Sequence, residues 1–369
     1  LIGFLSLIYL FFIFKKQYNF KNTFFNYFIF FCFWFYPFLH SRTSSENLSI
    51  SVFIFGLCLI YNYNFSKKDL FKLLTGIFLI GLSVDIRFNL IFSVAPLIVY
   101  LIFKLSDIIK ISSIILVFIF SLALGILIDS IFWGFYSNTF WQFYVYNMGA
   151  SDYLNSFGIE PWWYYISETI KTLSPLLSIV FIFSIIYFWF KKPFDYLTIT
   201  TFFHFIILSL IGHKEIRYIF PIFIFAPFFI IYLIDNINKK YLLNLIKPII
   251  VFSNIIFLLI ALFYPLNSKV SIYKYIHNIN DKNEIYYYGE NPYQLNNMEP
   301  FFYTKFLKKI KPYNNIDNNE HYVITKDFNF SKNKLYNCEL KYSTIPRFLF
   351  KINSNWKRLK LNWEIFHCK

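Results

Sequence analysis

Apolar runs long enough to cross a lipid bilayer recur along most of this sequence. They follow one another from Leu1 to about Pro265, and a short polar segment ends each of them. A helix needs about 20 apolar residues to cross a hydrocarbon core that is ~30 Å thick. We therefore expect an all-α polytopic membrane protein. Ten membrane spans are predicted, at residues 1–14, 23–39, 48–64, 71–84, 88–103, 111–128, 169–190, 194–211, 218–236 and 246–265.

The composition excludes an ordinary soluble protein. Hydrophobic residues make up 57% of the chain and the mean hydropathy is +0.49, whereas soluble domains contain roughly 45–50% apolar residues. The formal charge of +15 can indicate a nucleic-acid partner. However, residues 266–369 hold 17 basic and 9 acidic residues without a basic stripe or an RNA-binding aromatic motif, so no nucleic-acid partner is expected.

The sequence changes character after Pro265. Residues 266–369 are rich in Lys, Asn and Tyr and contain no further run of spanning length. We predict a multi-spanning domain over residues 1–265 and a small soluble α/β domain over residues 266–369. In the second domain, strands are expected near residues 285–288, 322–325 and 340–342, and a helix near residues 301–310.

The distribution of basic residues predicts the topology. Thirteen lie in alternate breaks between spans, namely Lys15, Lys16, Lys21, Lys67, Lys68, Lys72, Lys104, Lys110, Lys191, Lys192, Lys239, Lys240 and Lys247. Only five lie in the other breaks, namely Arg42, Arg87, Lys171, Lys214 and Arg217. The Lys-rich side is therefore expected to be cytoplasmic. This places the second domain and Leu1 on the exoplasmic side, so we expect at least one further span and one exoplasmic loop before Leu1.

The same topology gathers the unusual polar segments on the exoplasmic face. They are residues 40–47, 85–87, the long loop 129–168, and residues 213–217. Charges at the ends of spans are costly unless they reach water or a partner. Their clustering on one face suggests a shared site, although each segment could also simply anchor the end of a helix.

The most informative segment is Gly212-His213-Lys214-Glu215-Ile216-Arg217-Tyr218, followed by Pro221. It lies at the predicted membrane boundary, which is the depth of a lipid-linked phosphate. Lys214 and Arg217 supply charge and a guanidinium fork suited to phosphate oxygens, and His213 can donate a hydrogen bond or a proton. Lys and Arg also extend toward water at helix ends without any ligand, so the spacing alone is moderately specific.

Four segments in order resemble glycosyltransferase family 22, the polyprenyl-phosphate-mannose-dependent mannosyltransferases of GPI-anchor and N-glycan assembly and their bacterial relatives. The His-Lys-Glu-x-Arg-aromatic motif at residues 213–218 carries the closest likeness. The others are residues 41–47 (Ser-Arg-Thr-Ser-Ser-Glu-Asn), residues 84–87 ahead of Pro96, and the loop containing Asp129, Gly134, Phe143, Asn147, Gly158, Pro161, Trp162 and Tyr165. Trp133 stands where that family usually has Tyr.

The resemblance implies a GT-C fold and inverting sugar transfer. A carboxylate would remove a proton from an acceptor hydroxyl, whose oxygen attacks the anomeric carbon as polyprenyl phosphate leaves. The family's acidic pair is expected upstream of Leu1, with Asp129, Asp85 and Glu46 as alternative bases. The implied donor-phosphate ligands are His213, Lys214, Arg217, Arg42 and Arg87. The implied substrate contacts are Glu215, Asn147, Trp162 and Tyr165, although such aromatic residues also form belts at membrane interfaces.

The expected partners are a polyprenyl-phosphate sugar donor, a glycan or glycolipid acceptor, and membrane lipids. No metal or cofactor is expected, because the six His show no ligand spacing. The location would be the endoplasmic reticulum membrane in a eukaryote or the cytoplasmic membrane in a bacterium. Alternatives are another GT-C enzyme, with a different sugar or with a protein or lipid A acceptor, and a lipid-linked-sugar flippase. A flippase would favour mid-span charges and internal repeats, which are not evident.

Four cysteines divide between the two predicted domains. Cys32 and Cys58 fall inside spans, where we expect inert thiols. Cys338 and Cys368 fall in the predicted exoplasmic domain, where an oxidising compartment permits a disulfide. The sequence is equally compatible with two unpaired thiols at these positions.

Overall fold

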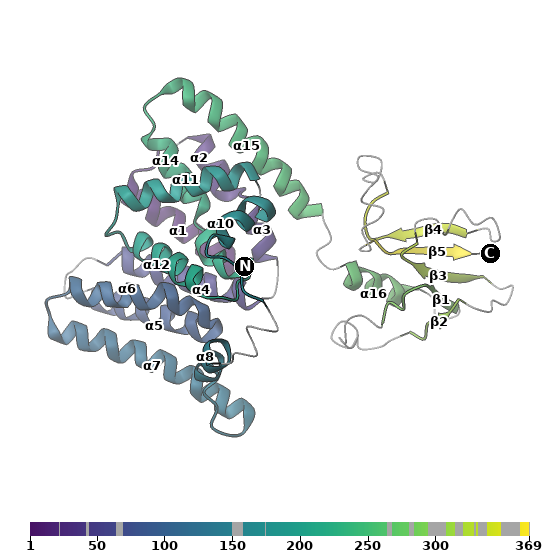
Figure 1. Cartoon of the computed structure of the whole chain (residues 1–369), viewed down its shortest axis with the longest axis horizontal. Coiled ribbons are helices and arrows are strands. Elements are labelled where there is room, and N and C mark those ends of the chain that lie inside the picture. The colour runs from purple at the N-terminus through teal and green to yellow at the C-terminus, as the bar shows by residue number, and fades with distance from the viewer. Residues whose placement is uncertain are drawn as a thin grey trace. The chain divides into compact units, whose positions relative to one another are not determined.

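The structure is a computed structural model that divides into two compact units, Leu1–Leu262 and Phe263–Lys369 (Figure 1). It describes residues 1–21, 23–41, 44–63, 69–149, 158–173, 175–263, 268–279, 284–293, 308–313, 320–327, 330, 338–347 and 362–368.

Each span that the sequence predicts contains at least one helix in the first unit. Its elements are α1 (Ile2–Tyr18), α2 (Phe24–Phe31), α3 (Phe35–His40), α4 (Ser45–Tyr61), α5 (Leu70–Ile86), η2 (Phe88–Leu90), α6 (Ile91–Lys104), α7 (Ile108–Trp133), α8 (Thr139–Gly149), α10 (Tyr164–Glu168), η3 (Thr169–Leu173), α11 (Pro175–Lys191), α12 (Tyr196–Leu210), η4 (Ile216–Ile219), α13 (Phe220–Phe223), α14 (Ala226–Asn236) and α15 (Lys240–Phe263).

These helices differ in whether they are long enough to cross a bilayer. Among the described residues, α7 and α15 are long and apolar enough. The segment Ile216–Phe223 with α14 makes a third candidate that is bent by 48°. Several other apolar helices have 10–17 residues. The helical membrane class is therefore confirmed, whereas the count of ten crossings stays a prediction.

Close approach of small residues joins α4, α5 and α7. A Cβ on Gly56 of α4 would lie 2.7 Å from the carbonyl oxygen of Gly76 on α5, and a Cβ on Gly81 would meet Ser121 of α7. Small residues let helix backbones approach in membrane proteins. Figure 1 shows α5, α6 and α7 side by side along one edge of the helical unit. Because α4 starts where α5 ends, Glu46 lies beside Arg87.

A buried asparagine on α15 forms hydrogen bonds with the backbone groups that the break between α2 and α3 leaves without helical partners. Asn254 is 0% exposed. Its Oδ1 accepts from the backbone N–H of Trp34 at 3.0 Å, and its Nδ2 donates to the carbonyl oxygen of Cys32 at 2.8 Å. Backbone groups freed at a helix break in a membrane need such internal partners. The predicted span 23–39 is therefore two short helices held together by a third.

Replacing Asn254 with leucine should destabilise the helical unit by about 2–4 kcal/mol, because two buried backbone groups lose their partner. The midpoint of thermal unfolding in detergent measures this. Asn236→Leu is the control, since within the described part of the chain the Asn236 side chain donates only to a carbonyl of its own helix. Equal small shifts in both variants would contradict the assigned role of Asn254.

The described residues of the second unit form a five-stranded sheet and one helix. Its elements are α16 (Ser268–Asn278), β1 (Glu284–Tyr288), β2 (Lys311–Pro312), β3 (His321–Thr325), β4 (Cys338–Ser343) and β5 (Glu364–Cys368), in the sheet order β2-β1-β3-β5-β4. The strand β1 pairs parallel with β2 and β3, and β5 pairs antiparallel with β3 and β4. Ile272 and Ile276 of α16 pack on Ile285, Ile324 and Ile365 of the sheet.

The sequence predicted β1, β3 and β4 but missed α16, β2 and β5. Of the helix predicted near residues 301–310, residues 301–307 lie outside the described residues, and residues 308–310 form no helix.

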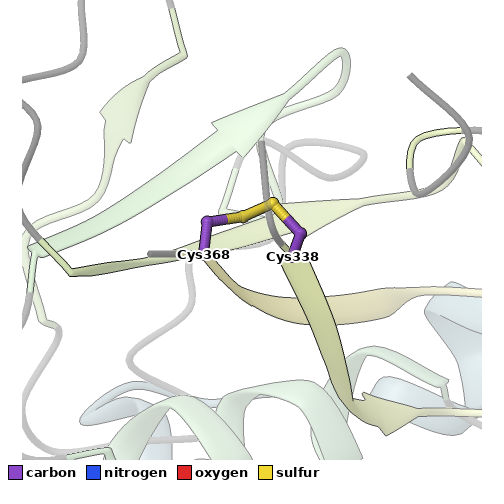
Figure 2. The surroundings of a disulfide bond; sticks show 2 residues. All are labelled: Cys338 and Cys368. Atoms are coloured by element: carbon purple, nitrogen blue, oxygen red, sulfur yellow. A yellow bond between two sulfur atoms is a disulfide. The ribbon is translucent and has the colours of Figure 1, made fainter. Parts of the chain in front are cut away.

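A disulfide joins the edge strand β4 to its neighbour β5. Cys338 on β4 is the register partner of Cys368 on β5, and their sulfur atoms are bonded (Figure 2). The two cysteines lie 30 residues apart in the sequence. The alternative of two unpaired thiols is therefore wrong, while Cys32 and Cys58 in the helical unit are free thiols.

Candidate functional site

The segment between α12 and α13, residues 211–219, carries the His-Lys-Glu-x-Arg motif. We call it the motif loop. A buried histidine holds it in place: His204 of α12 is 0% exposed, its Nε2 lies 2.9 Å from the carbonyl oxygen of Tyr218, and its Nδ1 lies 2.8 Å from Oγ of Ser93 on α6. The sequence alone assigned no role to His204. Its polar ring in the middle of a predicted span was the available signal.

Five charged or titratable side chains form a continuous chain of contacts, which we call the ion-pair chain. Arg87 Nη1 lies 3.1 Å from Glu46 Oε1, and Arg217 Nη1 lies 3.8 Å from the same oxygen. Arg217 Nε donates to Glu215 Oε2, and His213 Nε2 lies 3.4 Å from Glu215 Oε1. The structure thus brings together residues from the start of α4, the corner after α5 and the motif loop.

Burial differs sharply along the ion-pair chain. The side chains of Glu46 and Arg87 are 10% and 15% exposed, whereas that of Arg217 is 50% exposed. Partial burial raises the pKa of Glu215, but its hydrogen bonds and ion pairs with Arg217 and His213 outweigh burial and hold that pKa below its ordinary value. Arg217 is therefore an accessible guanidinium oriented by two carboxylates. Its Nη2 has no hydrogen-bond partner among the described residues.

Lys214 is directed away from the ion-pair chain. Its Nζ donates to the carbonyl oxygen of Glu160 at 2.9 Å and to that of Ile211, and the residue is 5% exposed. The N–H of Glu160 donates to Gly212 O at 3.0 Å. Burial lowers the pKa of Lys214, against the opposing charge of Glu160. Lys214 thus fastens the end of the long loop to the motif loop, and its predicted contact with the donor phosphate stays a prediction.

Replacing Lys214 with methionine should free the segment around Glu160. Loss of a charge-assisted hydrogen bond predicts amide exchange that is about tenfold faster or more at this segment. Hydrogen–deuterium exchange in detergent measures it. Lys171→Met is the control, because Lys171 is 66% exposed and pairs only with Glu168 among the residues that the structure describes. Unchanged exchange in Lys214→Met would contradict the fastening role.

Asp85 and Asp129 form a separate acidic pair. The Asp85 carboxylate packs on Gly125 of α7, where a Cβ would lie 2.5 Å from Asp85 Cγ. Asp129 on α7 is close enough for the two charges to interact. Asp85 Oδ2 is buried without a hydrogen-bond partner in the described part of the chain. No ion pair among the described residues connects either aspartate to the ion-pair chain. Across the same described residues, no group of three His, Cys, Asp or Glu side chains is arranged to hold a metal ion.

The other residues that the sequence suggested as ligand contacts differ in how exposed they are. Trp162 and Trp163 are 61% and 51% exposed and pack edge to face. Tyr165 differs from expectation: it is 1% exposed in the core, so its ring is not available to stack on a sugar. Asn147 belongs to α8, but its side chain lies outside the described residues, as does Arg42.

An apolar groove leads toward the motif loop. It encloses about 880 Å³ between α6, α8 and α12, and its wall contains Pro96, Val99 and Phe203. A smaller cavity of about 80 Å³ is lined by Asn89, His213, Tyr218 and apolar side chains. Ile91, Phe92 and Phe140 line both spaces. The groove and the cavity therefore adjoin, and the cavity reaches the motif loop.

Comparison with known proteins identifies one family. The model of the Alg9-like mannosyltransferase family matches residues 1–302 of the 369-residue chain, so the match includes α1 through α16 and β1. No curated protein and no solved structure matches the chain.

Proposed function

Because this chain belongs to the Alg9-like mannosyltransferase family, it is a membrane glycosyltransferase, and we propose that it transfers mannose from a polyprenyl-phosphate donor to a glycan or glycolipid on the exoplasmic face. The observation that carries this proposal is the junction of the apolar groove with the cavity at the motif loop. A lipid-linked sugar needs such a junction, because its chain is apolar and its phosphate is charged.

The groove suits a polyprenyl chain. The groove side chains Val99, Phe103, Trp141 and Phe194 are 51%, 83%, 58% and 75% exposed. All of the residues that line the groove are apolar or aromatic. In a membrane such a surface contacts hydrocarbon, and an isoprenoid chain is hydrocarbon of the same polarity. The groove would therefore hold the lipid with its phosphate directed toward the motif loop.

Arg217 and His213 would receive the phosphate. As the bond between the anomeric carbon and the phosphate oxygen breaks, negative charge grows on the departing polyprenyl phosphate, and a fixed guanidinium stabilises it. A carboxylate takes the proton of the acceptor hydroxyl as its oxygen bonds to the anomeric carbon. Within residues 1–369, Asp85 and Asp129 remain candidates for this base, because Glu46 is engaged with two arginines. Lys214 acts as a positioning residue.

Two features support the exoplasmic side. The disulfide between Cys338 and Cys368 is of the kind that persists in oxidising compartments. The thirteen basic residues of the Lys-rich breaks favour the cytoplasmic side for those ends of the helices.

Transfer in proteoliposomes tests the proposal. We expect activity with a labelled polyprenyl-phosphate-mannose donor and none with GDP-mannose. Ala95→Trp, which fills the groove, should raise KM roughly tenfold for a long-chain donor and little for a short-chain one, since only the long chain occupies the groove. Ile255→Trp on α15 is the control outside the groove. Transfer from GDP-mannose would refute the proposed donor, and an unchanged KM in Ala95→Trp would refute the groove as the site of its lipid chain.

A further inference from the structure

Asn89 is a buried amide that has no hydrogen-bond partner within the described residues. It lies in η2, at the corner between α5 and α6, and is 6% exposed. Both Nδ2 and Oδ1 are buried and unpaired there. Buried amide groups are nearly always hydrogen-bonded in proteins, and each exception needs an explanation. An absent ligand is one such explanation, because its polar groups would complete the pairing.

The Asn89 side chain lines the cavity of about 80 Å³ beside His213 and Tyr218. A single water molecule needs about 10–15 Å³ measured in this way, so the cavity has room for several ligand atoms. Its other walls are apolar, with Phe88 and Phe143 among them. Asn89 therefore forms part of the wall of a cavity that adjoins the apolar groove.

The two unpaired ends of the amide indicate the chemistry of the ligand. An amide has two N–H donors and one carbonyl acceptor. Ionised phosphate oxygens only accept, so they would leave Oδ1 unpaired, and a hydrocarbon chain would pair with neither end. A hydroxyl both donates and accepts. Neighbouring hydroxyls of a hexose therefore match Asn89 better than either other part of a lipid-linked sugar.

We propose that Asn89 binds ring hydroxyls of the donor's hexose and thereby selects the sugar that is transferred. This inference rests on the proposed function, because it assumes that the cavity receives the head of a lipid-linked sugar. Asn89 is then a specificity residue that contacts the substrate, distinct from the phosphate-binding role of Arg217.

Asn89→Leu, made in the full chain in proteoliposomes, tests the proposal against a set of donors that each lack one ring hydroxyl. The variant should lower kcat/KM about 10- to 100-fold for the mannose donor. It should cause little further loss for the deoxy donor that lacks the contacted hydroxyl. Phe140→Leu is the control in the same cavity and should affect all donors alike.

Stability without substrate gives a second readout. Asn89→Leu should unfold at a higher temperature than the wild type, because it removes an unpaired buried amide. α-Mannose 1-phosphate should raise the unfolding midpoint of the wild type, and that of Asn89→Leu much less.

The outcomes separate the two proposals. Equal losses for every deoxy donor, or full activity in Asn89→Leu, would overturn the sugar-binding role of Asn89 and leave the proposed function intact. If the wild type uses no polyprenyl-phosphate donor, the proposed function fails. The mannose 1-phosphate shift then decides about Asn89: equal shifts in wild type and Asn89→Leu would overturn the inference, and a shift lost in the variant would support it.

Discussion

Replacing Arg217 with lysine is expected to lower kcat/KM for mannose transfer about 100-fold, although the charge does not change. The guanidinium is planar and meets Glu215 through Nε and Glu46 through Nη1. With half of the side chain exposed, its remaining edge is open to a phosphate. A lysine ammonium is a point charge that cannot satisfy both carboxylates and a phosphate in this arrangement.

Steady-state kinetics with a polyprenyl-phosphate-mannose donor measures this effect. The matched control is Arg347→Lys in the second unit, where Arg347 forms a bidentate pair with Glu364 at 3.1 Å for both contacts. That variant loses the same fork and should leave transfer unchanged. Full activity in Arg217→Lys would show that charge alone suffices and that no fork holds the phosphate.

The second large effect concerns stability, and it arises at Glu46. Replacing Glu46 with glutamine should destabilise the helical unit by about 3 kcal/mol, because Arg87 stays buried without its counter-charge. The Arg87 side chain is only 15% exposed, and the hydrogen bond to Ser45 Oγ at 3.1 Å is its remaining polar contact with α4. The midpoint of thermal unfolding in detergent is the measurement.

A double-mutant cycle separates the buried pair from other consequences of the change. Glu46→Gln with Arg87→Met should cost clearly less than the sum of the two single variants, since no buried charge is left unpaired. Glu168→Gln is the control: its partner Lys171 is 66% exposed, so the loss should stay below about 0.5 kcal/mol. Additive losses in the cycle would mean that Glu46 and Arg87 contribute independently.

The helices of the first unit could be predicted because hydropathy is a local property of the chain. Each predicted span contains a helix, since a long apolar segment can satisfy its backbone only within itself in a membrane. The break between α2 and α3 could not be predicted in the same way. It depends on Asn254, which lies more than two hundred residues away in the sequence and supplies the missing partners.

In the second unit, too, some strands could be predicted from the local sequence, whereas others depend on contacts with distant residues. The strands β1 and β3 have continuous apolar or aromatic runs and were predicted, but β2 has two residues and no pattern of its own. The strand β5 lies at the end of the chain, and its pairing with β3 and β4 depends on residues far apart. The pairing of Cys338 with Cys368 follows from that register, so counting cysteines could not decide it.

The sequence by itself determined the membrane class, the family likeness and the motif loop, because hydropathy and short motifs are properties of neighbouring residues. Only the tertiary structure decided how the polar residues are used. It directs Lys214 to a backbone carbonyl, pairs Glu46 with Arg87, buries Tyr165 and leaves the Asn89 amide without a hydrogen-bond partner among the described residues. These outcomes depend on how each helix is rotated and which helix it meets. Hydropathy along one segment carries little information about either, because contacts between distant segments set both.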